Sequence, residues 1–212
     1  MVNVDIDISS LFEIAFGVKG FVRYQASVGQ EEVRADAARF DGIPVISDPV
    51  EASKMSFMGT PIIFPIKFRG GNYNFFDSQG DVVVFQMDDF EIPAATLVDF
   101  RRPKIITTSR AVATEGTTKE IYGFDDWQVE IRGIALRDPS RTTDVTAYEQ
   151  HLRLLEWENV VDAISVSGDL FVDKNISHLV IREAEFRAIQ GKPGMMPFVF
   201  KCVSDKPAEL FL

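Results

Sequence analysis

The sequence predicts a mainly β (α+β) protein: an antiparallel β-barrel or sandwich of two small sheets with one flanking helix, preceded by an N-terminal extension. Three observations lead to this prediction. Short apolar stretches rich in Val, Ile and Phe recur from residue 60 onwards, separated by Gly, Asp and Pro. Phenylalanine is frequent, with 18 residues among 212. Long helical patterns are rare, which gives one or two helices beside roughly eight strands.

The first 58 residues are predicted to form a helix and a loop-rich extension. Ser9 or Ser10 is a suitable helix N-cap, and Gly17 is a suitable helix end. The apolar stripe between them consists of Leu11, Phe12, Ala15 and Phe16. This helix either docks on its own domain or reaches a neighbouring subunit, and the sequence leaves both alternatives open.

The segment Gln25–Met58 has little periodicity and contains breakers such as Pro44. Irregular stretches of this length are usually functional or become ordered by a partner. We therefore expect this segment and the N-terminal helix to contact adjacent subunits. Phe12, Phe16 and Phe57 are the candidate interface residues of this region.

Residues 59–212 are predicted to form the β domain. In its first half, apolar runs alternate with turn-forming residues, which gives a series of strands and turns. These are an extended segment Pro61–Phe68, a hairpin turn at Arg69–Asn72, a strand at Tyr73–Phe76, a turn at Asp77–Asp81, a strong strand at Val82–Met87 and extended segments at Leu97–Phe100 and Lys104–Thr108.

The segment Trp127–Leu136 begins with a clear alternation of apolar and polar residues, which predicts a half-buried antiparallel strand. Gly133 interrupts the alternation and predicts a bulge or a close approach of another chain segment. After it, Ile134 and Leu136 place the apolar side on the opposite face.

The one long helix is predicted at Thr146–Trp157. Thr146 and Glu149 have the spacing of a capping box, in which each side chain accepts a hydrogen bond from the backbone of the other. The apolar face is predicted to consist of Val145, Tyr148, Leu152 and Leu155, and the polar face of Glu149, Arg153 and Glu156. Three further strands follow at Val160–Ser167, Leu179–Phe186 and Phe198–Val203.

The formal net charge of −10 argues against a nucleic-acid-binding surface, which needs clustered Lys and Arg. The single cysteine, Cys202, excludes an intrachain disulfide and is predicted to be a small core residue. No segment has the pattern of a signal peptide or the length of a membrane span.

Motifs for catalysis are missing from the sequence, so we expect no enzyme, no cofactor and no metal site. His151 and His178 have no Cys or His at metal-ligand spacing. An acid–base pair needs two separated carboxylates in unequal environments, whereas the paired carboxylates here are adjacent residues that fit turns and strand entries. These pairs, Asp88–Asp89 and Asp125–Asp126, are the candidates of one alternative, a cell-wall hydrolase.

The second half of the chain carries a recognisable order of motifs. A Thr-rich strand, Ile105–Thr108, leads into the turn Gly116-Thr-Thr-Lys-Glu120. The strand Asp126–Gly133 follows and ends on Ile-Arg-Gly, and after one helix the chain runs through further strands to Ser204-Asp205. This order resembles a family of proteins encoded in the tail modules of phages, prophages and related contractile injection systems of Bacteroidota.

The resemblance covers most of the chain and is densest over Thr60–Leu210. Thr118 departs from the family pattern, which has an apolar β-branched residue there. The resemblance implies a tail-tube-like barrel domain. It further implies a structural component that forms a ring at the junction of tail tube and baseplate, as a tube initiator or hub adaptor of a contractile phage-like particle.

The resemblance also implies partners and a location. The chain is expected to be a homo-oligomer, hexameric or trimeric, that contacts the tail tube, LysM-type proteins and hub or spike proteins of the baseplate. It is expected in the virion tail, assembled in the bacterial cytoplasm, with DNA passing through the lumen unbound and with no membrane contact. Lys119 and Glu120 are candidates for an ion pair between subunits. The alternative function is a small-molecule or carbohydrate-binding β-barrel module, which requires a deep apolar pocket.

Overall fold

The structure is a computed structural model that describes residues 8–17, 22–24, 45–46, 62–63, 65–110, 115–138, 141–187 and 194–206. The helices among these residues are α1 (Ile8–Phe16), α3 (Ala147–Glu158) and α4 (Asp169–Val172). The strands are β1 (Val22–Tyr24), β2 (Val45–Ile46), β3 (Ile62–Ile63), β4 (Lys67–Phe68), β5 (Gly71–Phe76), β6 (Val82–Met87), β7 (Phe90–Glu91), β8 (Thr96–Arg101), β9 (Lys104–Ser109), β10 (Thr118–Phe124), β11 (Gln128–Ala135), β12 (Ile164–Ser167), β13 (His178–Phe186) and β14 (Met196–Asp205).

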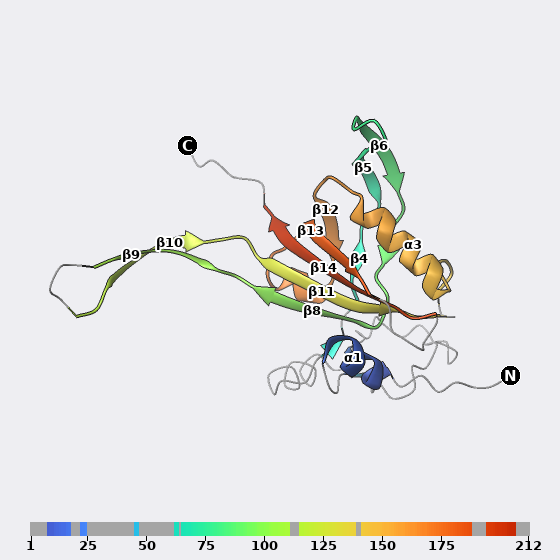
Figure 1. The fold of residues 1–212 in the computed structure, drawn as a ribbon, viewed down its shortest axis with the longest axis horizontal. Helices are drawn as coiled ribbons and strands as arrows, with labels where there is room; N and C mark the ends of the chain where they lie inside the picture. The colour runs from blue at the N-terminus through green and yellow to red at the C-terminus, as the bar shows by residue number, and fades with distance from the viewer. Residues whose placement is uncertain are drawn as a thin grey trace.

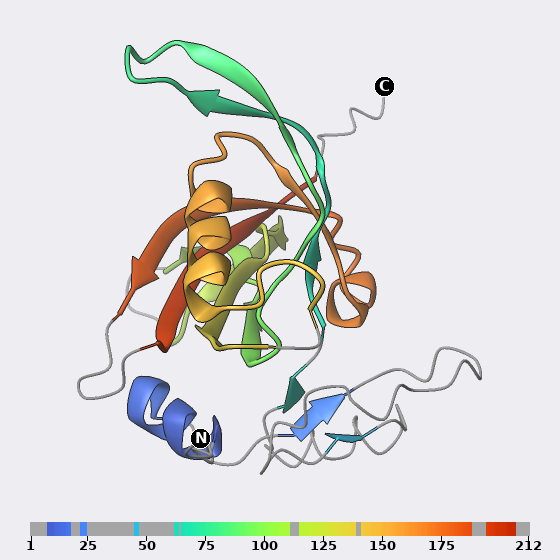
Figure 2. The same ribbon diagram turned by 90° about the vertical axis from the view of Figure 1, so that its right-hand side faces the viewer.

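The body of the protein is a curved sheet of seven antiparallel strands in the order β7-β4-β12-β13-β14-β11-β8 (Figures 1 and 2). Its two edge strands, β7 and β8, are consecutive in the sequence and are joined by residues 92–95. The sheet is therefore curved so strongly that a link of four residues is enough to connect its two edge strands. This architecture confirms the predicted fold class, a mainly β protein built on antiparallel pairing with a flanking helix.

The main hydrophobic core lies between this sheet and α3, which rests against one face of the curve (Figure 2). Trp157 of α3 is fully buried, with its ring 5.3 Å from the rings of both Phe68 and Tyr73. Thr146 caps α3 and forms the predicted capping box with Glu149. Cys202 is buried in the same core, as the sequence predicted.

The buried face of α3 differs from the predicted one. The buried residues are Ala147, Gln150, Leu154 and Trp157, whereas Tyr148 and Leu152 of the predicted apolar stripe are exposed. The polar Gln150 is buried because its side-chain amide donates to the carbonyl oxygen of Leu136 at 2.7 Å. Because that hydrogen bond satisfies the amide group in the core, the helix face that carries Gln150 and Trp157 can be buried.

A second, smaller core lies on the opposite face of the sheet, at the far end of β11. Leu11 and Phe12 of α1 pack there against Leu97, Ile134 and Leu136. Because α1 covers this face, Ile134 is buried on the side opposite to Ile131, which confirms the predicted change of the apolar side. The pairing of β11 runs without a bulge through Gly133, so the glycine marks a close approach instead.

The N-terminal helix begins at Ile8, so Ser9 and Ser10 lie inside it and are not its cap. Gly17 ends it as predicted, in a left-handed conformation with φ +71°. The strands β1 and β2 from the predicted extension form a parallel three-stranded sheet with β3, in the order β2-β1-β3. Apart from β2, the segment Gln25–Met58, with Phe57, lies outside the described residues.

The hairpin turn expected at Arg69–Asn72 is wrong. This segment instead carries the chain from one sheet to another, since β4 pairs with β7 and β12 whereas β5 pairs with β6. A Cβ at Gly70 would lie 2.6 Å from the carbonyl oxygen of Met87, so the crossing requires glycine. The turn at Asp77–Asp81 and the strand Val82–Met87 are confirmed.

Candidate assembly surfaces

The strands β9 and β10 form a two-stranded ribbon that leaves the body of the molecule and is called the arm below (Figure 1). The arm continues the pair β8–β11 outward, because Asp125 donates its backbone N–H to the carbonyl oxygen of Pro103 at 3.0 Å between the two halves. Its five large apolar residues are between 47% and 67% exposed: Ile105, Ile106, Ile121, Tyr122 and Phe124. Within the described residues, neither edge of the arm pairs with a third strand.

The two faces of the arm differ in charge. Directly opposite residues of an antiparallel pair share a face, and successive residues alternate. One face, the basic face, carries Lys104, Ile106, Thr108, Lys119, Ile121 and Phe124. The other face carries Glu120 and Tyr122, whose hydroxyl donates to the Glu120 carboxylate at 2.6 Å. A bulge between Ile121 and Gly123 accommodates Tyr122 on that side.

Lys119 and Glu120 therefore point to opposite faces of the arm, in a strand and not in a turn. Both side chains are exposed. Each can contact a different neighbouring surface, but the two cannot meet the same surface together. The expected ion pair between subunits would thus need a different partner for each residue.

The base of the arm is held by cations stacked on aromatic rings. The guanidinium of Arg102 lies 4.7 Å from the centre of the Phe124 ring and 5.3 Å from that of Trp127. The Lys104 ammonium lies 5.6 Å from the centre of the Phe124 ring. Arg102, which follows β8, thus contacts both the arm and the residue that precedes β11, and exposed contacts of this kind contribute about 0.5–1 kcal/mol each.

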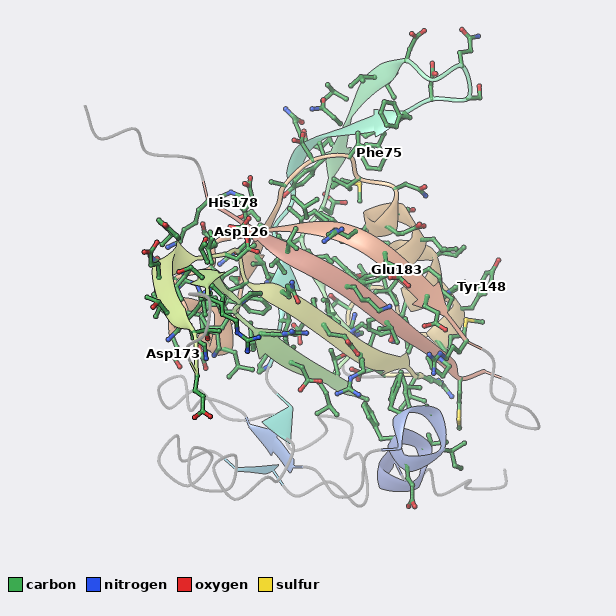
Figure 3. The ribbon with its side chains drawn as sticks, turned by 60° about the vertical axis from the view of Figure 1, so that its left-hand side comes forward. Phe75, Asp126, Tyr148, Asp173, His178 and Glu183 are labelled. Atoms are coloured by element: carbon green, nitrogen blue, oxygen red, sulfur yellow. The ribbon has the colours of Figure 1, made fainter. Side chains whose placement is uncertain are left out.

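A second ribbon, the β5–β6 hairpin, leaves the body elsewhere, and Phe75 marks it in Figure 3. Tyr73 and Met87 anchor its inner face in the main core. Its outer face carries Phe76, Val82 and Val84, which are 59–63% exposed and adjacent across the strand pair. On the inner face, Phe85, which lies opposite Tyr73, is also 57% exposed.

These exposed residues of the β5–β6 hairpin were not among the candidates predicted from the sequence. A signal for them exists in the strand Val82–Phe85, where four consecutive residues are apolar. A strand with one solvated face would alternate, so an unbroken apolar run indicates two covered faces. The pair Ile105–Ile106 gives the same signal in the arm.

The outer face of the seven-stranded sheet is charged (Figure 3, Glu183). Lys201 pairs with Glu183 at 2.9 Å, Arg187 with Glu185 at 2.9 Å, and Arg132 with Asp99. The hydrogen bond from Arg187 lowers the pKa of the Glu185 carboxyl, and the one to Glu183 raises the pKa of the Lys201 ammonium.

A groove of about 560 Å³ crosses this charged face, lined by Asp99, Arg101, Glu130, Arg182, Glu183 and Lys201 among others. A second cavity of about 270 Å³ lies beside β7 and is lined mainly by charged and polar residues. Neither of these two cavities is the deep apolar pocket that a small-molecule-binding barrel would need.

Among the predicted interface residues, Phe12 is fully buried within its own chain, and Phe16 packs beside it with the ring centres 5.3 Å apart. The structure thus places α1 in the docking role, one of the two alternatives that the sequence left open. Phe16 is half-buried.

The paired aspartates lie in connections, as predicted: Asp88–Asp89 between β6 and β7, and Asp125–Asp126 between β10 and β11. Asp89 accepts the backbone N–H of Gly70 at 2.8 Å, which lowers the pKa of its carboxyl. A general acid needs the opposite shift. Within the described ranges, no three His, Cys, Asp or Glu side chains lie close enough together to hold a metal ion.

The two histidines occupy structural positions. The His151 ring lies edge-on to the ring of Phe186, with 4.9 Å between the ring centres. His178 opens β13, and its Nδ1 lies 3.0 Å from the hydroxyl oxygen of Ser177. In the part of the chain that the structure describes, no helix is both long and apolar enough for a membrane span.

The solved structures that are similar to this chain include two chains of gene transfer agent (GTA) particles. One is from the tail of an empty GTA particle, refined helically with C6 symmetry, at a TM-score of 0.33 and 12% identity. The other is from the virion of a native GTA particle, at a TM-score of 0.30 and 13% identity. Each comparison covers 64% of this chain and 91% of the other. With TM-scores this low, neither likeness carries an argument about function.

A search among curated proteins found no relative of this chain. A family model, described as Domain of unknown function (DUF6046), matches residues 91–212. This range includes the arm, α3 and the strands β8 to β14. Because it spans more than half of the 212 residues, the chain belongs to the DUF6046 family.

Proposed function

We propose that this chain is a structural, non-enzymatic subunit that assembles into a hexameric or trimeric ring in the tail of a contractile phage-like particle. Its place there is the junction of tail tube and baseplate, as a tube initiator or hub adaptor. The location and the layer rest on the order of motifs in the sequence. The assembly itself rests on the exposed surfaces of the arm.

The arm is the observation that carries the proposal. A two-stranded ribbon is only marginally stable in water by itself, yet this one exposes large apolar side chains on both faces. Full burial of an exposed Ile or Phe side chain contributes roughly 1.5–3 kcal/mol, and these half-exposed side chains can gain a corresponding part of it. The unpaired edges of β9 and β10 are also templates for strands of another chain. A neighbouring subunit would cover these faces and edges together.

The absence of a built reactive site among the described residues is compatible with a non-enzymatic role but does not carry it. The support is the chemistry of the carboxylates: Asp89 is held in its ionised form by the Gly70 N–H and by Lys67 at 3.6 Å. A carboxylate occupied in this way orders the connection to β7 instead of transferring protons.

The test is the oligomeric state of the full chain, measured by light scattering coupled to size exclusion and by electron microscopy. We expect closed rings. The double variant Ile106→Asp/Ile121→Asp places charges on the exposed arm and should give monomers with an unchanged circular dichroism spectrum.

The matched control is Val172→Asp, which makes the same chemical change at an apolar residue of α4 that is 72% exposed. This variant should form rings like the wild type. A wild-type chain that stays monomeric at every concentration, also when mixed with tail-tube and baseplate proteins, would remove the proposal.

A further inference from the structure

Among the residues that the structure describes, the arm and the β5–β6 hairpin are two ribbons that project from the body of the protein in different directions (Figures 1 and 2). Within one chain, neither ribbon can therefore cover the other. Both expose contiguous apolar residues, Ile106 and Ile121 on the arm and Val82 and Val84 on the hairpin.

The charged residues of the hairpin are all acidic. The sequence has no Lys or Arg from Gly70 to Phe100, and the hairpin carries Asp77 and Asp81 at its tip. The Asp77 carboxylate caps the turn by accepting the backbone N–H groups of Gln79 at 2.8 Å and Asp81 at 2.9 Å. The exposed apolar face thus ends in a rim of negative charge.

The basic face of the arm carries charges of the opposite sign. Ile106 and Ile121 are directly paired at its centre, with Lys119 towards the tip and Lys104 towards the base. Glu120 points to the other face. The lysines beside the apolar residues of the arm are opposite in sign to Asp77 and Asp81 at the tip of the hairpin, and such charge complementarity selects the partner and its orientation.

The two surfaces also match in size. The strands of the hairpin have six residues each, and those of the arm have six and seven. At a rise of roughly 3.3 Å per residue, both ribbons extend over about 20 Å. Two ribbons of equal length can pack face to face and enclose one apolar layer, as the two sheets of a sandwich do.

We propose that the basic face of the arm of one copy packs on the outer face of the β5–β6 hairpin of a second copy. The contact is head-to-tail, because each copy contributes a different surface, and it leaves the hairpin of the first copy and the arm of the second free for further copies. A contact of this kind closes a ring or propagates a filament. The inference rests on the proposed ring function and names the surfaces that build it.

The apolar layer supplies most of the stabilisation, and the charges supply orientation. An exposed ion pair contributes only about 0–1 kcal/mol, less than one newly buried Ile or Phe side chain. Replacing the charges should therefore shift which copies associate, whereas replacing the isoleucines should abolish association.

Cross-linking between copies tests the contact. Full-length Ile121→Cys and Val84→Cys variants, each first shown to form rings, are mixed in equal amounts and oxidised with copper phenanthroline. The native Cys202 is buried and does not interfere. The control mixture combines Tyr122→Cys with Phe85→Cys, which are equally exposed but lie on the opposite faces of the same ribbons.

We expect a cross-linked dimer from the first mixture and only background from the control mixture. A second pair, Ile106→Cys with Val82→Cys, should behave like the first and replaces it if either variant fails to assemble. Rings that give no cross-link with either pair, or that cross-link as strongly in the control mixture, overturn the inference and leave the ring function standing. A monomeric chain overturns both.

Discussion

Gly133 in β11 lies directly opposite Phe198 in β14, and the Phe198 ring occupies the space that a side chain at position 133 would need. The backbone of β11 and the ring are thus in direct contact at the junction of the two cores. The absence of a side chain at this position is a condition for both strands to keep their register.

Replacing Gly133 by Ala should destabilise the protein by about 1–3 kcal/mol, the usual cost of overpacking a core. The added Cβ would lie 2.5 Å from Phe198 Cζ and would also contact the hydroxyl of Thr96, which is fixed by its bond to Pro93. The measurement is urea unfolding. In the control Gly71→Ala, the Cβ meets Tyr73 at an ordinary 3.7 Å and stability should hardly change. Equal stabilities of the two variants would contradict the close packing.

The capping box of α3 makes stability depend on pH. The Glu149 carboxylate accepts the backbone N–H of Thr146 at 2.9 Å, which lowers the pKa of Glu149 below its ordinary 4.5. Because the folded state favours the ionised form, this stabilisation is complete above pH 4.5 and is lost as the pH falls through the folded-state pKa.

The stability difference between wild type and Glu149→Gln should therefore shrink on acidification, as measured by urea unfolding at a series of pH values. The variant Thr146→Ala should cost about 1 kcal/mol near neutral pH. Glu158→Gln, at the other end of the helix, is the control and should not reduce stability, because a negative charge there opposes the helix dipole. A difference that stays constant with pH would contradict the role of the carboxylate.

The Cys202 thiol should be almost unreactive in the folded protein. Its side chain is 3% exposed, and burial raises its pKa to about 12. Thiolate is the reactive form, so at mildly alkaline pH both access and ionisation are minimal. Labelling with a chromogenic disulfide reagent should be slow in buffer and fast in denaturant. Rapid labelling of the folded chain would show that β14 is not buried as described.

Ring assembly should respond to charge reversal on the two ribbons. Lys119→Glu and Asp81→Lys should each weaken assembly alone, since each places like charges across the contact, and a mixture of the two variants should regain part of it. Added salt should reduce these differences, because exposed charges are screened over about 10 Å at moderate ionic strength. The control Lys206→Glu changes an exposed lysine beyond β14. Equal effects of all three single variants would argue against the assigned faces.

Much of the fold could be predicted from local patterns. The turn at Asp77–Asp81, the strand Val82–Met87 and the capping box at Thr146 depend on neighbours in the sequence, and all three are confirmed. Cys202 was correctly placed in the core because a lone cysteine in an apolar strand behaves as a small hydrophobic residue.

The predictions are wrong where a residue's burial or a strand's pairing depends on a partner that is distant in the sequence. Gln150 is buried with its side-chain amide donating a hydrogen bond to the carbonyl oxygen of Leu136, and no periodicity in the helix reveals that acceptor. The chain at Arg69–Asn72 resembles a hairpin turn, but β4 finds its partners in β7 and β12. The sequence predicts that the apolar residues change to the other face of the strand after Gly133. It does not predict the cause, which is that α1 covers that face.

The candidate surfaces were predicted only in part. Lys119 and Glu120 lie on the arm as exposed residues, but the sequence alone did not separate them onto opposite faces. The bulge at Tyr122 and the pairing with β9 set that geometry. The hairpin residues Phe76 and Val84 are not among the predicted interface residues, because an apolar strand by itself does not reveal which of its faces its own chain covers.

The link between Glu91 and Thr96 has a mechanical consequence. Five peptide units reach at most roughly 18 Å, so this short covalent strap limits how far the margins of the curved sheet can separate. The distance between the two edge strands of the sheet is limited by the length of this link, because β7 and β8 do not form hydrogen bonds with each other as paired strands. Extra residues inserted into this link would allow β7 and β8 to move apart. The sheet from which both ribbons project would then be less rigid.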